Sequence, residues 1–280
     1  MEHSILKSYV RMKAFVGEGI GTFVLTLFGC GSVAVAILFG EYSGIFQVGL
    51  IWGTAVTLAI YLTRYLSCAH LNPAVTLAMV LSKRMEANKL LPYMAAQLLG
   101  AFAAGLVLYL LFSPSIAAYE SAHQIVRGTV ASVDTARMFG EFYPNPGDTG
   151  AVVSMPLAMF AEGFGTFLLV MFIFALTEGC NVGRPSDALA PLFIGLTVSS
   201  IIFLVAPLTQ AGLNPARDFG PRLVAWLMGW GEAAFPQPGS GGFFWVYIFS
   251  PLLGGTLAAY ALTYGIEPLI KRKDTSCDCH

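Results

Sequence analysis

The tetrapeptide Leu71-Asn72-Pro73-Ala74 recurs as Leu213-Asn214-Pro215-Ala216, at an offset of 142 in a chain of 280 residues. A second stretch, Gly17-Glu18-Gly19-Ile20-Gly21-Thr22-Phe23, is echoed by Ala161-Glu162-Gly163-Phe164-Gly165-Thr166-Phe167 at an offset of 144. Two unrelated motifs that recur at nearly the same offset indicate that the chain consists of two copies of one unit.

Six stretches around these motifs are long and apolar enough to cross a bilayer, which takes about 20 residues. We place them near residues 14–39, 49–64, 89–112, 157–177, 188–206 and 243–265. Apolar residues form 56% of the chain and charged residues 11%, which argues against an ordinary soluble protein and against disorder. The net charge of −1 argues against nucleic-acid binding. We therefore expect an all-α, multi-pass membrane protein.

The Lys and Arg residues predict the orientation, because cytoplasmic loops carry an excess of them. With the N-terminus inside, eleven basic residues are cytoplasmic and the outer loops keep only Arg127 and Arg137. Both chain termini are then cytoplasmic, and the plasma membrane is the expected location. The cytoplasmic set is Lys7, Arg11, Lys13, Arg64, Lys83, Arg84, Lys89, Arg184, Lys271, Arg272 and Lys273.

Each copy of the unit holds three spans and one apolar segment that is too short to span. Because three is odd, the two copies must lie in the membrane with opposite polarity, as in many channels and transporters. The predicted parts are a tail (1–13), a first repeat (14–112) with a half-helix at 72–82, an external loop (113–156), a second repeat (157–266) with a half-helix at 214–228, and a C-terminal tail (267–280).

Each Asn-Pro-Ala motif predicts the start of a short helix, because Asn is a good N-cap and Pro is favoured at the first helical position. Residues 72–82 form about 16 Å of helix, half of a hydrocarbon core of about 30 Å. Two such half-helices can meet head to head at the midplane. Their positive dipole ends then disfavour cations, and the amides of Asn72 and Asn214 are free to donate into a pore.

The extended segments before the two motifs cannot satisfy their own main-chain groups, so at this depth they must be buried by protein or line water. We expect their carbonyls to form a ladder of acceptors for a polar, uncharged solute. The carbonyls belong to Cys68, Ala69, His70, Gln210, Ala211 and Gly212.

Four ionisable residues lie at membrane depth, where charge is costly and usually functional. We expect Arg217 to present donors at an outer narrowing of the pore; the alternative is an interfacial arginine paired with Asp218. Glu18 and Glu162 are expected to accept hydrogen bonds from the irregular backbone beside them, with a proton relay as the alternative. His70 is expected to be a packed histidine rather than a titrating one.

The five cysteines are an odd number, and three of them, Cys30, Cys68 and Cys180, read as small packed residues. The terminal Cys277-Asp278-Cys279-His280 has the ligand types for a soft metal, but one short terminal cluster is a weak signal. We therefore expect no metal site and no cofactor.

These residues resemble the major intrinsic proteins, that is, the aquaporins and aquaglyceroporins, over nearly the whole chain. The resemblance implies six spans, two half-helices, one pore per subunit and a homotetramer. Within the family the chain is similar to the bacterial glycerol facilitators, which implies a bacterial inner membrane as its location. That similarity is carried by Asp218, Arg222, Pro251 and Leu252, and by the loop stretches 123–128 and 143–146.

The resemblance also implies a selectivity filter formed by Trp52, Ile202, Ala211 and Arg217. Trp52 stands twenty residues before Asn72, as in glycerol facilitators. Those proteins carry Phe where this chain has Ala211 and Gly where it has Ile202, so the set is more similar to that of the plant nodulin-26-like branch. We expect an aperture wider than that of a water-only pore, although Trp52 is also open to a plain packing role.

The expected function is passive, single-file conduction of glycerol, related small neutral solutes and water, with exclusion of ions and protons. Urea, arsenite and boric acid remain alternative solutes. A proton-coupled secondary transporter is a second hypothesis, with Glu18 and Glu162 as its only titrating candidates. A membrane enzyme is a third, for which no nucleophile and base stand at matched positions in the two copies.

Overall fold

The computed structural model describes residues 2–42, 44–147, 150–179, 181–237 and 239–271, with side chains described between residues 9 and 269. Cys180 and the tail stretch Cys277–His280 lie outside the described residues. The helical elements are α1 (Glu2–Phe39), α2 (Ile45–Thr63), α3 (Pro73–Leu81), η1 (Ala87–Lys89), α4 (Leu90–Ala122), η2 (Val130–Ser132), α5 (Val133–Ala136), α6 (Met155–Thr177), α7 (Ala190–Thr209), α8 (Pro215–Ala225), η3 (Trp226–Trp230), η4 (Gly231–Ala234), η5 (Phe244–Phe249), α9 (Ser250–Tyr260), η6 (Ala261–Ile266) and α10 (Glu267–Lys271).

Six helices of the described chain are long and apolar enough to cross a membrane: α1, α2, η1 with α4, α6, α7, and the continuous run from η5 into α10. All six are longer than the sequence predicts, and α1 and α4 exceed their predicted ranges by the most. Helix α1 begins at Glu2, inside the predicted tail 1–13, and α4 continues past the predicted end at residue 112 to Ala122. The extension of α4 passes through Pro114, and it is held because Ile116 and Glu120 are buried against the outer loop.

The two half-helices start where the sequence predicts. Helix α3 is capped by Asn72 and ends at Leu81, one residue before the predicted end. Helix α8 is capped by Asn214 and gives way after Ala225 to η3, in which Met228 and Gly229 have non-helical backbone angles. The predicted half-helix 214–228 is therefore shorter as a regular α-helix.

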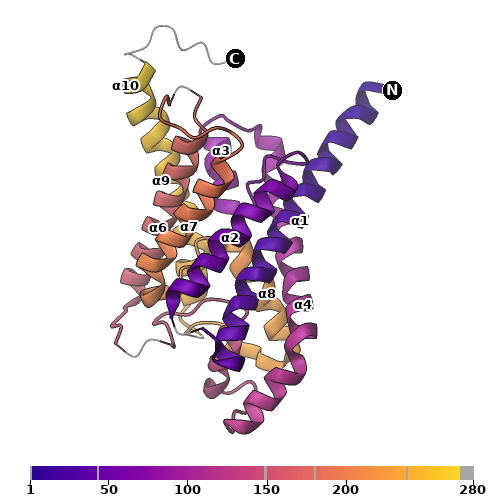
Figure 1. The fold of residues 1–280 in the computed structure, drawn as a ribbon, viewed down its shortest axis with the longest axis vertical. Coiled ribbons are helices and arrows are strands. Elements are labelled where there is room, and N and C mark those ends of the chain that lie inside the picture. The colour runs from indigo at the N-terminus through magenta and orange to yellow at the C-terminus, as the bar shows by residue number, and fades with distance from the viewer. Residues whose placement is uncertain (1, 43, 148–149, 180, 238, 272–280) are drawn as a thin grey trace.

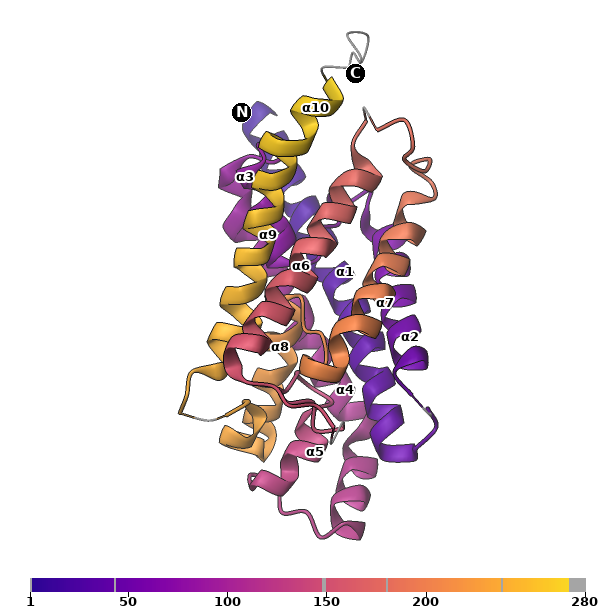
Figure 2. The same ribbon diagram turned by 90° about the vertical axis from the view of Figure 1, so that its left-hand side faces the viewer.

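The half-helices enter the bundle from opposite ends, as an inverted repeat requires. Figure 1 shows α3 near the end that holds the start of α1 and α10, whereas α8 lies toward the other end. Figure 2, turned by a quarter, shows the same separation of α3 from α8, with α5 at the far end, beyond α8. The spans surround both short helices, which places the tips of the half-helices in the interior.

Glycines let the main spans approach one another closely, and they do so at matching places in the two repeats. A Cβ atom on Gly100 would lie 2.1 Å from the carbonyl oxygen of Gly19, where α4 crosses α1. In the second repeat a Cβ on Gly254 would lie 1.9 Å from the carbonyl oxygen of Gly163, where α9 crosses α6. Gly53 of α2 similarly touches the main chain of α7. Close crossings at small residues stabilise helix packing in lipid by van der Waals contact, because the hydrophobic effect does not drive helices together there.

Candidate functional site

The two Asn-Pro-Ala motifs meet head to head and are hydrogen-bonded to each other. Each asparagine caps its own helix: Asn72 Oδ1 accepts from the amide of Ala74 at 2.8 Å, and Asn214 Oδ1 accepts from the amide of Ala216 at 3.1 Å. The side-chain amide Nδ2 of Asn72 donates to the main-chain carbonyl of Leu213 at 2.9 Å, and Nδ2 of Asn214 donates to the main-chain carbonyl of Leu71 at 2.7 Å. The predicted free amides are thus half used, since one N–H of each ties the two repeats together.

The segments before the motifs have the same unusual backbone in both repeats. Ala69 and Leu71 have φ of 51° and 55°, and their counterparts Ala211 and Leu213 have φ of 64° and 55°. The left-handed region is uncommon for residues other than glycine, and such strain is kept only where the surroundings impose it. Here the buried glutamates impose it.

Glu18 binds the first of these segments. Its carboxylate is fully buried and accepts hydrogen bonds from the amides of His70 at 3.0 Å and Leu71 at 2.7 Å, and from the hydroxyl of Ser67 at 2.7 Å. The side chain of Gln97 donates a fourth bond at 2.7 Å and also binds Thr76 of α3. Gln97 was not singled out from the sequence, because an amide in a long apolar span has no local signature.

Glu162 binds the second segment in the same way. It accepts from the amides of Gly212 at 2.9 Å and Leu213 at 2.7 Å, and from the hydroxyl of Thr209 at 2.6 Å. Tyr247, also not predicted, donates its hydroxyl proton to the carbonyl of Thr209 at 2.9 Å. Both oxygens of each glutamate are thus occupied by donors of the chain, which favours the predicted structural role over a proton relay.

These bonds determine where the carbonyls point. In a trans peptide the N–H and C=O groups face opposite ways. Because the amides of His70 and Leu71 face Glu18, the carbonyls of Ala69 and His70 face away from it. By the same reasoning the carbonyls of Ala211 and Gly212 face away from Glu162. In the two remaining peptides of the ladder, the amide of Ala69 donates to the hydroxyl of Ser67 and the amide of Ala211 donates to the hydroxyl of Thr209. The carbonyls of Cys68 and Gln210, which belong to the same two peptides, therefore face away from these hydroxyls.

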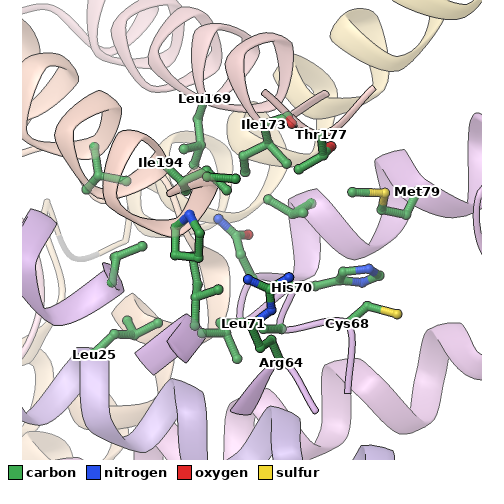
Figure 3. Close-up of a pocket in the computed structure, with 18 of the residues that line it drawn as sticks. Leu25, Arg64, Cys68, His70, Leu71, Met79, Leu169, Ile173, Thr177 and Ile194 are labelled. Atoms are coloured by element: carbon green, nitrogen blue, oxygen red, sulfur yellow. Dashed lines mark hydrogen bonds between the residues drawn. The ribbon is translucent and has the colours of Figure 1, made fainter. Parts of the chain in front are cut away.

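A cavity of about 200 Å³ extends from the meeting point of the half-helices toward the end that holds α3. Both Asn72 and Asn214 line it, as do Cys68, Ala69 and His70. Figure 3 shows His70 and Cys68 on one side of this cavity and Leu169, Ile173 and Ile194 on the other. One wall therefore offers polar groups and the facing wall, from α6 and α7, is apolar.

His70 packs as predicted but keeps one feature of note. Its ring lies 5.2 Å from the ring of Tyr93, and its side chain is 8% exposed. Within the described chain its Nδ1 has no hydrogen-bond partner. The thiol of Cys68 is exposed rather than packed as the sequence suggested, because it lies at the rim of the cavity.

Beyond the asparagines, on the α8 side, Arg217 and Trp52 are in direct contact. The guanidinium carbon of Arg217 lies 4.0 Å from the centroid of the Trp52 ring, and both side chains are buried. Trp52 has room because a Cβ on Gly29 would come within 2.2 Å of its ring. Arg217 is not an interfacial arginine, since only 3% of it is exposed.

The other two predicted filter residues are buried in the same core. Ile202 packs its γ2 methyl against Gly49, which lies three residues from Trp52 and hence on the same face of α2. Ala211 is 5% exposed and follows the left-handed Gln210 at the end of α7. The structure thus brings Trp52 and Arg217 together and sets Ile202 beside the Trp52 face.

Asp218 and Arg222 form a buried pair behind Arg217. Arg222 donates to Asp218 from Nη2 at 2.8 Å and from Nε at 3.1 Å. The Arg222 guanidinium lies 5.2 Å from the ring centroid of Phe142 and 5.1 Å from that of Phe243. Pro251, near the start of α9, is buried, whereas Leu252 is partly exposed. Neither lies among the residues that line the cavity.

One residue that the sequence reasoning missed completes this outer site. Glu141, in the loop between α5 and α6, forms an ion pair with Nη2 of Arg217, and each side chain is 4% exposed. Its signal in the sequence is a single carboxylate in an otherwise apolar run, 138–142. Among the described residues, no group of three or more His, Cys, Asp and Glu side chains is placed to hold a metal ion.

Inverted three-span repeats that meet through paired half-helices, with a half-polar passage beside the joint, define a membrane channel of the aquaporin type. Residues 5–264 match the sequence profile of the family described as Major intrinsic protein, and the chain belongs to this family. The all-α fold predicted from the sequence is confirmed by a solved relative, the aquaglyceroporin of Plasmodium falciparum. The match has a TM-score of 0.79 at 26% identity and covers 94% of this chain and 99% of that one.

Curated relatives from bacteria are more similar in sequence. The glycerol uptake facilitator protein of Escherichia coli K12 is 41% identical over 246 residues, which cover 88% of this chain and 85% of that protein. The propanediol uptake facilitator PduF of Citrobacter freundii is 40% identical over 249 residues, covering 89% of this chain and 90% of that protein. The predicted resemblance to the bacterial glycerol facilitator branch is therefore confirmed.

Proposed function

We propose that this protein is a passive channel that conducts glycerol, related small neutral solutes and water across the membrane while excluding ions and protons. The main support is the cavity beside the asparagine joint, with polar groups on one wall and apolar side chains on the other. A polyol has the matching character, since its hydroxyls can bond to carbonyls while its carbon backbone slides along Ile173, Ile194 and Val198. No cofactor or covalent step is needed.

The proposal assigns the selectivity filter to Trp52, Ile202, Ala211 and Arg217. Arg217 supplies donors for hydroxyl groups, and Trp52 and Ile202 supply the apolar surface. Ions are excluded because no group of the passage replaces a full hydration shell. Protons are excluded because the positive ends of α3 and α8 meet at the midplane. Asn72 and Asn214 also orient the water molecules at that point.

The proposal includes a homotetramer in the bacterial inner membrane with both termini in the cytoplasm. The exposed apolar side chains of α6 and α7, among them Phe164, Phe193 and Leu196, are surfaces that other subunits or lipid would cover. The basic residues predicted to be cytoplasmic support the orientation.

Osmotic swelling of proteoliposomes tests the proposal. We expect glycerol to enter at a rate well above that of empty liposomes, and the rate to be unchanged when an uncoupler dissipates a proton gradient. Urea, boric acid and arsenite, measured in the same vesicles, rank the alternative solutes. Glycerol entry no faster than in empty liposomes would refute the channel, and entry that collapses with the uncoupler would favour a coupled transporter.

Exchanging the two atypical filter positions should move the solute preference. In the double variant Ala211→Phe with Ile202→Gly, bulk moves from the α7 wall to the loop wall. We expect the ratio of glycerol to urea permeability to change by about fivefold, which corresponds to roughly 1 kcal/mol of altered contact. Leu204→Ala, on the exposed face of α7, is the matched control. An unchanged ratio would mean that these two residues do not line the filter.

A further inference from the structure

The outer loop places one carboxylate, that of Glu141, against the proposed filter. The residue belongs to the segment between α5 and α6, yet its side chain is as buried as that of Arg217, to which it is paired. The inference that follows rests on the proposed channel function and names a further determinant of its selectivity.

The main chain of Glu141 is held from both sides, so the position of its side chain is imposed by the fold. Its amide donates to Oδ1 of Asp218 at 2.7 Å, and its carbonyl accepts from Nη2 of Arg222 at 2.7 Å. The preceding Gly140 lies so close that a Cβ there would be 2.6 Å from the Arg222 guanidinium carbon. The Asp218–Arg222 pair thus holds the main chain of Glu141 where its side chain contacts Arg217.

The ion pair between Glu141 and Arg217 also determines the net charge at the narrowing of the pore. Two guanidinium groups, of Arg217 and Arg222, face two carboxylates, of Glu141 and Asp218, so the buried cluster is neutral when all four are ionised. Asp218 is engaged mainly by Arg222, since its Oδ1 lies 2.8 Å from Arg222 Nη2 but 3.8 Å from Arg217 Nη1. Glu141 is therefore the group that neutralises Arg217.

The same contact divides the donors of Arg217. Its Nη2 is engaged by Glu141, whereas within the described part of the chain its Nη1 has no hydrogen-bond acceptor, although it is buried. With the guanidinium carbon over the Trp52 ring, 4.0 Å from its centroid, Nη2 is engaged and Nη1 is available. The hydroxyl oxygen of a passing solute can supply the acceptor that Nη1 lacks.

We propose that Glu141 is a fifth selectivity determinant of this channel: its carboxylate cancels the charge of Arg217 and holds the guanidinium against Trp52 with Nη1 presented to the solute. Without that carboxylate the narrowing carries a net positive charge, which admits small anions and releases the arginine from its fixed orientation.

The ionisation of Glu141 makes this role dependent on pH. Burial raises the pKa of the Glu141 carboxyl to about 7, against the opposing pull of the Arg217 guanidinium. The groups within electrostatic reach of it are Arg217, Asp218 and Arg222 of α8, Cys30 of α1, Glu162 of α6 and Tyr247 of η5. Because the carboxylate neutralises Arg217 only when ionised, anion exclusion should be strongest above about pH 7 and should weaken as the pH falls through that value.

The test compares Glu141→Gln with wild type in proteoliposomes, using potassium nitrate with valinomycin for anion entry and glycerol for solute entry. Glutamine keeps an oxygen that can accept from Arg217 but cannot neutralise it. We expect nitrate entry to rise by about tenfold in this variant, because a unit charge a few ångströms from the path is no longer balanced. The matched control is Glu120→Gln, which removes a carboxylate paired to Arg127 in the same outer region, away from the filter.

The pH profile separates a charge role from a merely structural one. Nitrate entry in wild type should rise as the pH falls through about 7 and approach the level of Glu141→Gln, which should not vary with pH. Glu141→Asp, which retains the charge, should behave as wild type. Nitrate exclusion that is equal in wild type and Glu141→Gln, or a flat wild-type profile, would overturn the inference. Absence of glycerol entry in wild type would instead refute the channel itself.

Discussion

Replacing Glu162 with alanine is expected to abolish glycerol conduction and to destabilise the protein strongly. Three donors, the Thr209 hydroxyl and the amides of Gly212 and Leu213, would lose their buried acceptor. Each unsatisfied donor costs about 1–3 kcal/mol, so the loss is about 3 kcal/mol or more. The left-handed backbone of the second loop would then have nothing to hold it.

Thermal unfolding of the purified protein in detergent and glycerol entry into proteoliposomes measure this effect. Glu162→Gln should be intermediate, because its amide offers one acceptor oxygen in place of two. Glu232→Ala, an exposed acid of the outer region, is the control for the loss of a carboxylate. If Glu162→Ala kept both wild-type stability and wild-type conduction, the loop geometry would not depend on the carboxylate.

Replacing Arg217 with valine is expected to open the channel to cations. The substitution removes the positive charge that opposes the raised pKa of the Glu141 carboxyl, so the narrowing becomes negative only at a pH well above 7, where Glu141 is ionised without its ion-pair partner, and the leak is measured there. We expect potassium or proton entry to rise by about tenfold or more. Swelling in potassium salts and pH-jump decay of an entrapped dye measure the two leaks.

The double variant Arg217→Val with Glu141→Gln gives this prediction its control. It removes both charges, so the leak should fall well below that of Arg217→Val alone. Arg217→Lys should keep cations out while altering glycerol entry, because an ammonium group has no planar face to stack on Trp52. An ion-tight Arg217→Val variant with normal glycerol entry would contradict the role assigned to Arg217.

Local signals in the sequence predicted the parts of this structure that are encoded locally. Asn-Pro at 72–73 and 214–215 is a capping signal, and both half-helices start there. The repetition of Glu18 at Glu162 indicated a shared structural role, and both glutamates bind the backbone beside the motifs. The six spans followed from apolar length, with the largest errors at the start of α1, where an extension of the helix, exposed at residues 9–13, replaces the predicted tail, and at the end of α4, where Ile116 and Glu120 are buried.

The parts that sequence reasoning missed depend on contacts between distant segments. Glu141 reaches Arg217 only because Asp218 and Arg222 clamp its loop, a contact across 77 residues for the Glu141 amide. Gln97 meets Glu18 across 79 residues. The bonds from Asn72 and Asn214 to the opposite loops likewise required the two repeats to be placed together, which no spacing along the chain reveals.

The exchange of bonds between Asn72 and Leu213 and between Asn214 and Leu71 has a bearing on how such a chain arises. Each half donates one hydrogen bond to the other half and accepts the equivalent bond from it, which is the pattern of a twofold contact between identical partners. A gene encoding a single half would yield molecules able to couple as upside-down pairs through the same joint. Fusing two such genes end to end would keep the joint and free each half to diverge.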